Sequence, residues 1–364
     1  MATDLPPITT CTPVAFWDRE QDQDLVCIDV RQETHDVKTF SFRSREPRQF
    51  GLLAGQYFRF ELVLNGEPIS RCYSVSSSTL NPSVFSVTVK RVPGGRVSNW
   101  MHDNVHPGMN LHGVGPSGAF TLPPALDGPF LFISGGSGVT PVMSMLRTLA
   151  DARLHPDIVF LHAGRSPADL VFRDELLYRA KVTPHLRVLF LPEKAETEPG
   201  YSGITGRISE ALLQLAVPDL AQRTVMCCGP APFMAAVRTL SQALGVPPTR
   251  YVEESFDGSG AAESSAATEG TSPPASSEGF SVTFAKQAKV IPAQANQSVL
   301  AAVRQAGLSM PSSCGNGLCG TCKTKLVSGQ VDMQHTGGIR QREVDAGFFL
   351  PCCSKPLSDL VIDR

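Results

Sequence analysis

Four of the ten cysteines follow a spacing that strongly restricts what the C-terminal part of the chain can fold into. Cys314, Cys319 and Cys322 form a C-x4-C-x2-C pattern, and Cys352 follows after 29 further residues. Three thiolates on one tight loop and a fourth from farther along the chain can complete two tetrahedral irons bridged by sulfides. This spacing is the plant-type signature of a [2Fe–2S] cluster.

The glycines between these cysteines support the same prediction. Gly315, Gly317 and Gly320 let the backbone fold closely around a cluster and direct amide N–H groups at its sulfurs. A structural zinc site usually joins two C-x2-C knuckles, and the sequence offers one here. Four unrelated buried cysteines would have no reason to keep this spacing, so the sequence predicts a [2Fe–2S] site.

A stretch of unusual composition divides the chain. Residues 257–278 contain no Val, Ile, Leu or aromatic residue and four acidic residues without a base, so they cannot bury enough apolar surface to offset the entropy of ordering. We therefore expect a flexible linker before a C-terminal unit, residues 279–364, whose segments predict a small α+β fold. Residues 1–24 are polar and are assigned to an N-terminal extension.

Two different patterns precede this linker. Residues 25–125 show short alternating segments such as VKTFSF and VFSVTVKR, separated by turn residues, which is typical of an antiparallel β-barrel or sandwich. Residues 126–256 alternate strands such as FLFIS and IVFLHAG with helical segments, which predicts an α/β domain with a parallel sheet. Ligands of such folds bind outside the carboxyl ends of the strands.

The overall charge and hydropathy argue against two kinds of partner. The 32 basic and 34 acidic side chains give a formal net charge of −2, so there is no global basic footprint for nucleic acid. No apolar run approaches the roughly 20 residues that a membrane span needs. The chain starts without the basic and apolar segments of a secretion signal, and we expect a cytoplasmic protein with no nucleic-acid or membrane partner.

Two short motifs in residues 25–125 point to a flavin. In Arg71-Cys72-Tyr73-Ser74, Arg suits a phosphate, the aromatic ring can cover an isoalloxazine, and the hydroxyl can hydrogen-bond the ring edge. Farther on, Gly94-Gly95 before a helix start offers amide N–H groups to a second phosphate. Each motif alone also fits an ordinary strand end or a capped turn. The predicted flavin-binding residues are Arg71, Tyr73, Ser74, Lys90, Gly95, Arg96, Val97, Ser98 and Phe256.

A glycine-rich turn in residues 126–256 is typical of a dinucleotide site. In FISGGSGVTPVMSML a strand leads through the glycines into a helix, where a pyrophosphate can approach the helix N-terminus closely. Arg165 either pairs with a 2′-phosphate or is a solvated loop residue, and we favour NADH over NADPH. The predicted NAD-binding residues are Gly136, Ser137, Gly138, Thr140, Arg165, Cys228, Gly229 and Pro230.

These motifs and their order carry a resemblance to a known family. The flavin segments resemble the flavin domain of the ferredoxin–NADP reductase superfamily, and PSSCGNGLCGTCKTKL with FFLPCCSKP resembles the β-grasp domain of plant-type ferredoxins, which favours Cys352 over Cys353 as the fourth ligand. Flavin, nucleotide and iron–sulfur regions in this order resemble single-chain reductases of Rieske non-haem iron oxygenases. The segment CGNGLCGTCKTKLVSGQVDMQHTGGIR is most similar to reductases of quaternary-ammonium monooxygenases, especially those for glycine betaine.

The resemblance implies an NAD(P)H-dependent flavin iron–sulfur oxidoreductase. Electrons would pass from NADH through FAD and the [2Fe–2S] cluster to a Rieske-type monooxygenase that N-demethylates a quaternary ammonium substrate such as glycine betaine. Ser74 and Cys228 are the predicted catalytic residues, because Ser74 would hydrogen-bond flavin N5 and Cys228 would border the nicotinamide beside Thr140. Phe256 would lie near the flavin ring. FMN as the flavin, a hybrid-cluster protein as partner, and a Rieske oxygenase for aromatic rings or carnitine are the alternatives.

The C-terminal unit is basic, with nine Lys or Arg side chains and five acidic ones in residues 279–364. Lys323 and Lys325 lie beside the cysteine loop in the sequence. Their face either docks on an acidic patch of the oxygenase or of the flavin domain, or is only solvated.

Overall fold

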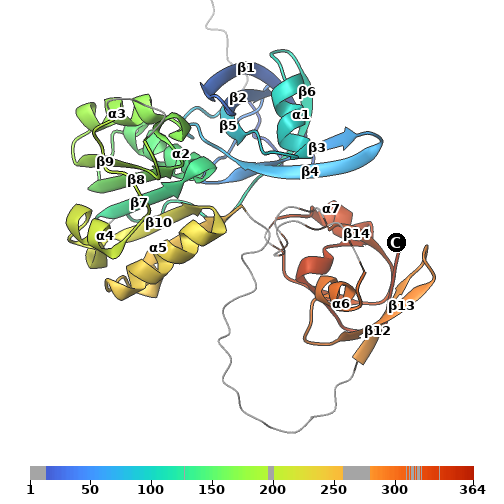
Figure 1. Cartoon of the computed structure of the whole chain (residues 1–364). Coiled ribbons are helices and arrows are strands. Elements are labelled where there is room, and N and C mark those ends of the chain that lie inside the picture. Colours follow the sequence, from blue (N-terminus) through green and yellow to red (C-terminus); the bar gives the residue numbers. More distant parts are fainter. Residues whose placement is uncertain are drawn as a thin grey trace, which may run out of the picture.

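The computed structural model describes residues 14–364 of the chain apart from several short stretches. Those outside it are residues 127, 196–200, 257–278, 309, 311, 313, 314, 316, 318, 319, 321 and 336. The described residues form three parts, each built around its own main β-sheet (Figure 1). The predicted fold class, an antiparallel barrel followed by an α/β domain and a C-terminal α+β domain, is confirmed.

The first part is a closed antiparallel sheet. Its elements are β1 (Asp24–Thr34), β2 (Val37–Ser44), β3 (Tyr57–Leu64), β4 (Glu67–Ser74), β5 (Phe85–Lys90), the helix α1 (Arg96–Asn104) and β6 (Asn110–Ser117). The strand order is β4-β3-β6-β1-β2-β5, and a bridge between Val75 and Val87 joins the two edges into a barrel. Alternate residues point inside, where the fully buried Phe58 stacks on Phe85 with ring centroids 4.1 Å apart.

The second part is a parallel five-stranded sheet with the order β11-β10-β7-β8-β9, covered by helices on both faces (Figure 1). Its elements are β7 (Phe130–Gly135), η1 (Gly136–Gly138), α2 (Val139–Asp151), β8 (Ile158–Gly164), η2 (Pro167–Asp169), α3 (Arg173–Val182), β9 (Leu186–Pro192), α4 (Glu210–Ala216), η3 (Leu220–Gln222), β10 (Thr224–Gly229), α5 (Ala231–Ala243), η4 (Pro248–Arg250) and β11 (Tyr251–Ser255). Successive strand residues face opposite sides, so Phe132 packs with α2 and α3, and Ile133 packs with α4 and α5. Among the described helices, none combines the length and apolar character needed to cross a membrane.

The third part is a mixed five-stranded sheet with a small two-stranded one. Its elements are β12 (Gly279–Phe284), β13 (Lys289–Gln294), α6 (Val299–Gln305), β14 (Thr324–Ser328), β15 (Val331–Met333), α7 (Gln341–Asp345), β16 (Phe348–Phe349), η5 (Pro351–Cys353), β17 (Ser354–Pro356) and β18 (Leu360–Ile362). The main sheet has the order β13-β12-β18-β14-β16, and β15 pairs with β17. The terminal segments FFLPC and LVIDR each contribute a strand, but they do not pair with each other, because β14 lies between them and pairs with each.

The barrel and the parallel sheet are bonded to each other along α2. Arg147 is 9% exposed, and its Nη1 donates to the carbonyl oxygen of Ser76 at 2.7 Å. On its other side, its Nε donates to the Glu175 carboxylate at 3.0 Å. Ser144 Oγ donates to the carbonyl oxygen of Ser77 at 2.7 Å. These bonds fix the chain just after β4 against α2, and they set the relative position of the two domains.

Replacing Arg147 with Met should destabilise this junction. The change removes a buried guanidinium and its hydrogen bonds to the Glu175 carboxylate and the Ser76 carbonyl, while Glu175 keeps Arg179, so we expect the free energy of unfolding to fall by about 1.5–3 kcal/mol. Arg179→Met is the matched control, because Arg179 also binds Glu175 at 2.8 Å but only within its own helix. The control should cost less than about 1 kcal/mol. Equal shifts of the urea midpoints in the two variants would contradict a special role for Arg147.

Candidate functional site

A cavity of about 400 Å³ opens between the barrel and the parallel sheet. Its size is that of a small-molecule or cofactor site. The lining residues are Tyr57, Arg71, Cys72, Tyr73, Ser74, Thr88, Lys90, Val92, Gly95, Arg96, Val97, Ser98, Ser137, Thr140, Glu254, Ser255 and Phe256. All nine residues predicted to bind the flavin are among them. The last five come from the second domain, so the predicted flavin and nucleotide sites meet in one cavity.

The N-terminus of α1 is suited to an anion. Gly95 precedes the helix, and it lines the cavity together with Arg96, Val97 and Ser98. No side chain caps this N-terminus, so its first amide N–H groups are available to a phosphate. Ser98 does not cap this helix, because the N-cap residue is Gly95 and the Ser98 Oγ accepts a hydrogen bond from the N–H of Val92 at 3.2 Å.

Three cationic side chains also line the cavity. Arg71, Lys90 and Arg96 all come from the barrel, on β4, β5 and α1. The Lys90 ammonium lies 3.2 Å from Asp36, and the Arg96 guanidinium lies 2.9 Å from Glu67. Positive side chains near uncapped amides form the donor set that the diphosphate of FAD requires, so the residues present fit this cofactor.

Ser74 and Glu254 meet in the cavity. Ser74, at the end of β4, is 5% exposed, and its Oγ donates to Oε2 of Glu254 on β11 at 3.5 Å. Burial of the carboxyl group raises the pKa of Glu254 to about 8, and the Ser74 hydrogen bond opposes part of the rise. Glu254 is missing from the predicted site although Phe256 belongs to it. Residues two apart on a strand share a face, so strand alternation was the signal that could have identified Glu254.

Two of the residues predicted for NAD reach the cavity wall, namely Ser137 and Thr140. An added Cβ at Gly138 would lie 2.3 Å from the carbonyl oxygen of Cys228, so η1 packs closely against β10 because residue 138 is glycine. The Cys228 side chain is fully buried in the core cluster that includes α2, and its contact with a nicotinamide stays a prediction. The other predicted residues at these strand ends, also off the cavity wall, are Gly136, Gly229 and Pro230.

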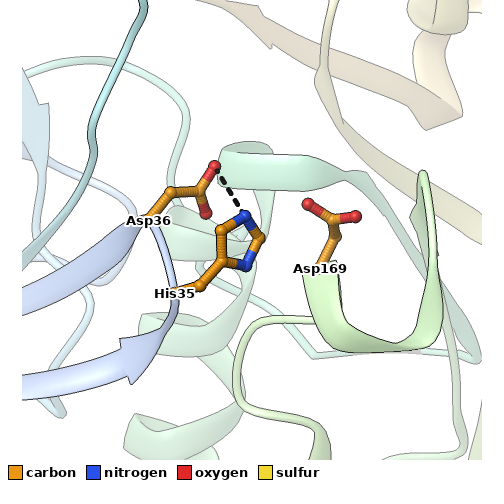
Figure 2. Close-up of side chains that lie close together, drawn as sticks. All are labelled: His35, Asp36 and Asp169. Carbon is orange, nitrogen blue, oxygen red and sulfur yellow. Dashed lines mark ion pairs between the residues drawn. The ribbon is translucent and has the colours of Figure 1, made fainter. Parts of the chain in front are cut away.

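Arg165 follows β8 and lies among acidic side chains. Its Nη2 is 2.5 Å from Oδ1 of Asp169 and 3.5 Å from Oδ2 of Asp36. Figure 2 shows the two carboxylates on either side of His35, whose Nε2 is 3.7 Å from Asp36. These three side chains are close enough to hold a metal ion. We assign none, because Arg165 and Lys90 already neutralise the two carboxylates.

The cysteine loop is described in part. The predicted ligands Cys314 and Cys319 lie outside the described residues. The other two, Cys322 and Cys352, come together with their Sγ atoms 3.2 Å apart. The N–H of Gly317 donates to Cys352 Sγ at 3.2 Å. Two adjacent sulfurs with an amide directed at one of them suit the cysteine ligands of an iron–sulfur cluster.

Three protein-family models match consecutive parts of the chain. The oxidoreductase FAD-binding domain matches residues 24–122, the oxidoreductase NAD-binding domain matches residues 132–239, and the 2Fe-2S iron-sulfur cluster binding domain matches residues 282–357. The chain is therefore an oxidoreductase that combines FAD-binding, NAD-binding and [2Fe–2S] domains.

Similar proteins narrow this class to a family. The glycine betaine monooxygenase reductase subunit of Pseudomonas aeruginosa is 41% identical over 350 residues, which are 93% of this chain and 94% of that protein. The stachydrine N-demethylase reductase subunit of Rhizobium meliloti is 35% identical over 98% of this chain and 100% of that protein. The chain belongs to the family of the glycine betaine monooxygenase reductase subunits. The structure of phthalate dioxygenase reductase shares its fold over 94% of this chain and 98% of that one, with a TM-score of 0.57 at 23% identity.

The raised pKa of Glu254 predicts a pH-dependent effect of Glu254→Gln. In the unfolded chain this carboxyl ionises near its ordinary value of 4.5, and in the folded protein it ionises near 8. Between these values the native state binds the extra proton, so wild-type stability falls by up to about 1.4 kcal/mol per pH unit relative to the variant, which cannot ionise. Thermal unfolding should therefore show a Tm difference in favour of Gln that grows from pH 5 to pH 8. A difference independent of pH would contradict the raised pKa.

The adjacent residues Cys352 and Cys353 should respond differently to replacement by serine. Cys352→Ser should abolish the visible absorption of the cluster, because Cys352 Sγ is the sulfur that lies beside Cys322 and accepts the Gly317 amide. Cys353→Ser should largely preserve it, because Cys353 Sγ approaches the carbonyl oxygen of Leu350 at 3.6 Å. Absorption spectra of the two purified variants test the assignment, and the opposite result would overturn it.

Proposed function

We propose that the chain is the reductase component of an N-demethylating monooxygenase system. It takes electrons from NADH and passes them through FAD and a [2Fe–2S] cluster to a Rieske-type oxygenase, whose substrate is a quaternary ammonium compound such as glycine betaine. The observation that carries the proposal is the match over 93% of the chain to a reductase subunit named for glycine betaine monooxygenase, with all three cofactor-binding domains in one chain.

The residues of the chain act in this proposal by positioning. FAD, when bound, accepts a hydride and can release electrons singly to an iron–sulfur cluster, which is the redox chemistry that this chain needs. Ser74 would hydrogen-bond the edge of the flavin, and Arg71 with the α1 N-terminus would hold its phosphates. Ser137 and Thr140 line the same cavity from the second domain and would place the nicotinamide against the flavin. No side chain need act as a nucleophile.

The surroundings of Arg165 support NADH as the reductant. Asp36 and Asp169 both lie within 3.5 Å of its guanidinium. A 2′-phosphate would bring about two negative charges to a place where the positive charge is already matched by carboxylates. We therefore propose that NADPH is the poorer substrate.

Electrons would leave the chain through the C-terminal domain. The proposed cluster ligands are Cys314, Cys319, Cys322 and Cys352. Both relatives described above are named as reductase subunits, one for glycine betaine and one for stachydrine, and these names support an N-methylated quaternary ammonium substrate for the partner oxygenase. The cytoplasmic location expected from the sequence stays a prediction.

Reconstitution tests this proposal. The purified reductase, NADH, glycine betaine and the oxygenase component of a glycine betaine monooxygenase should together release formaldehyde, and omission of either protein should stop it. NADH should give a higher kcat/KM than NADPH in the same assay. A reductase that reduces ferricyanide with NADH but supports no formaldehyde release, and instead reduces a hybrid-cluster protein, would overturn the proposed partner.

A further inference from the structure

A short segment of the C-terminal domain rests on the barrel side of the molecule. Residues 337–343, called the docking segment below, include the start of α7, which lies close to β3 and β4 in Figure 1. Arg340 Nη1 donates to Oε1 of Gln23 at 3.5 Å, and the N–H of Gln341 donates to Oε2 of Glu20 at 3.2 Å. The polar residues just before β1 therefore contact the C-terminal domain.

Arg59 of β3 is a buried charge in this contact, as is Arg340 of the docking segment. Arg59 is 3% exposed, and its Nη1 donates to the carbonyl oxygen of Gly338. Its Nη2 lies 2.8 Å from Glu61 on its own strand and 3.9 Å from Glu343 of α7. An added Cβ at Gly320 would lie 2.3 Å from Nη1, so the cysteine loop packs directly on the guanidinium. A buried charge is costly unless it is paired, so this contact depends on the partners that both domains provide.

Two bonded routes lead from the docking segment to the cysteine loop. The N–H of Gly338 donates to the carbonyl oxygen of Gly317 at 2.8 Å, and the N–H of Gly317 donates to Cys352 Sγ. Glu343 also binds the ammonium of Lys323, the residue after the third cysteine of the motif. Lys323 was expected on a basic face that is either solvated or docks on a partner. In the structure its ammonium is instead paired with a carboxylate of its own domain.

The same strand of the barrel reaches the cofactor cavity. Tyr57, two residues before Arg59 on the same face of β3, lines the cavity and is 2% exposed. An added Cβ at Gly337 would lie 3.7 Å from its phenol oxygen. One strand thus connects the cavity wall, the docking segment and the cysteine loop.

We propose that Arg59 is a positioning residue that docks the C-terminal domain on the barrel, so that the cysteine loop is held beside the flavin cavity. Its planar fork binds a backbone carbonyl through Nη1 and lies near two carboxylates through Nη2, which the single ammonium of lysine does not reproduce. A covalently joined domain has a high effective concentration, so a small set of such contacts can select the docked arrangement. The role rests on FAD and the cluster occupying their proposed sites and is independent of which oxygenase receives the electrons.

The test compares Arg59→Met with the wild type as holoproteins. In the variant, hydrogen–deuterium exchange of peptides that span the docking segment should speed up several-fold, because the segment loses its buried anchor. In stopped flow, reduction of the flavin by NADH should keep its rate, while the following reduction of the cluster should slow by about tenfold or more, since small misplacements of reacting groups have large kinetic effects. Arg59→Lys should give intermediate values for both readouts.

Arg43→Met is the matched control, because Arg43 is an exposed arginine on β2 that donates to the backbone of Ser44 and Arg45. It should change neither readout. Unchanged exchange and unchanged cluster reduction in Arg59→Met would overturn the proposal, and so would an equal slowing of flavin reduction, which would assign Arg59 to the flavin site. If Arg59→Met fails to retain FAD, Arg59→Lys carries the same test. Failure to release formaldehyde with the oxygenase would count against the proposed partner and would leave both readouts interpretable.

Discussion

Arg147 of α2 binds the barrel through the Ser76 carbonyl and its own domain through Glu175 of α3, and the cofactor cavity depends on this bonding. The walls of the cavity come from both domains, so neither domain forms the site by itself. Ser74 ends β4 two residues before Ser76, and Thr140 begins the helix that carries Arg147. Fixing Ser76 against α2 therefore also fixes the distance between the side that suits a flavin and the side that suits a nicotinamide. The lining residues can position two bound groups relative to each other only because this junction holds the two domains in place.

Much of the site could be predicted because its chemistry is local in the sequence. Arg71, Tyr73 and Ser74 are consecutive or nearly so, and the turn before α1 brings its amides and Arg96 with it. Other residues line the cavity from strands whose local sequence contains no recognisable motif. Glu254 and Tyr57 were missed for this reason, since each sits on a strand whose orientation depends on tertiary packing. Cys228 is the opposite case, because the sequence motif around it is recognisable but its side chain lies in the core.

The fold class was predictable from hydrophobic periodicity, and details of pairing were not. Strand β6 contains Gly113, Gly115 and Pro116, which in a sequence are typical of a loop. In the structure an added Cβ at Gly113 would lie 2.3 Å from the Leu25 side chain, so this glycine is a packing requirement inside the barrel. Likewise, the apolar residues of FFLPC and LVIDR suit short strands but do not show that β14 lies between them. Contacts between domains, such as that of Arg59 with Gly338, join residues 279 positions apart and leave no periodic signal.

Where the cysteine loop and the docking segment approach the barrel, several positions are glycine. An added Cβ would clash with Arg59 at Gly320 and with the Gly317 carbonyl of its own domain at Gly338, and it would lie close to Ser117 at Gly337. At these glycines the surface is defined by the path of the main chain, and the side chains of Arg340 and Glu343 add the polar contacts beside it. An exchange of iron–sulfur domains between related reductases would therefore need these glycines as well as matching side chains on the barrel, and a chain that lost one of the glycines would need compensating changes in both domains.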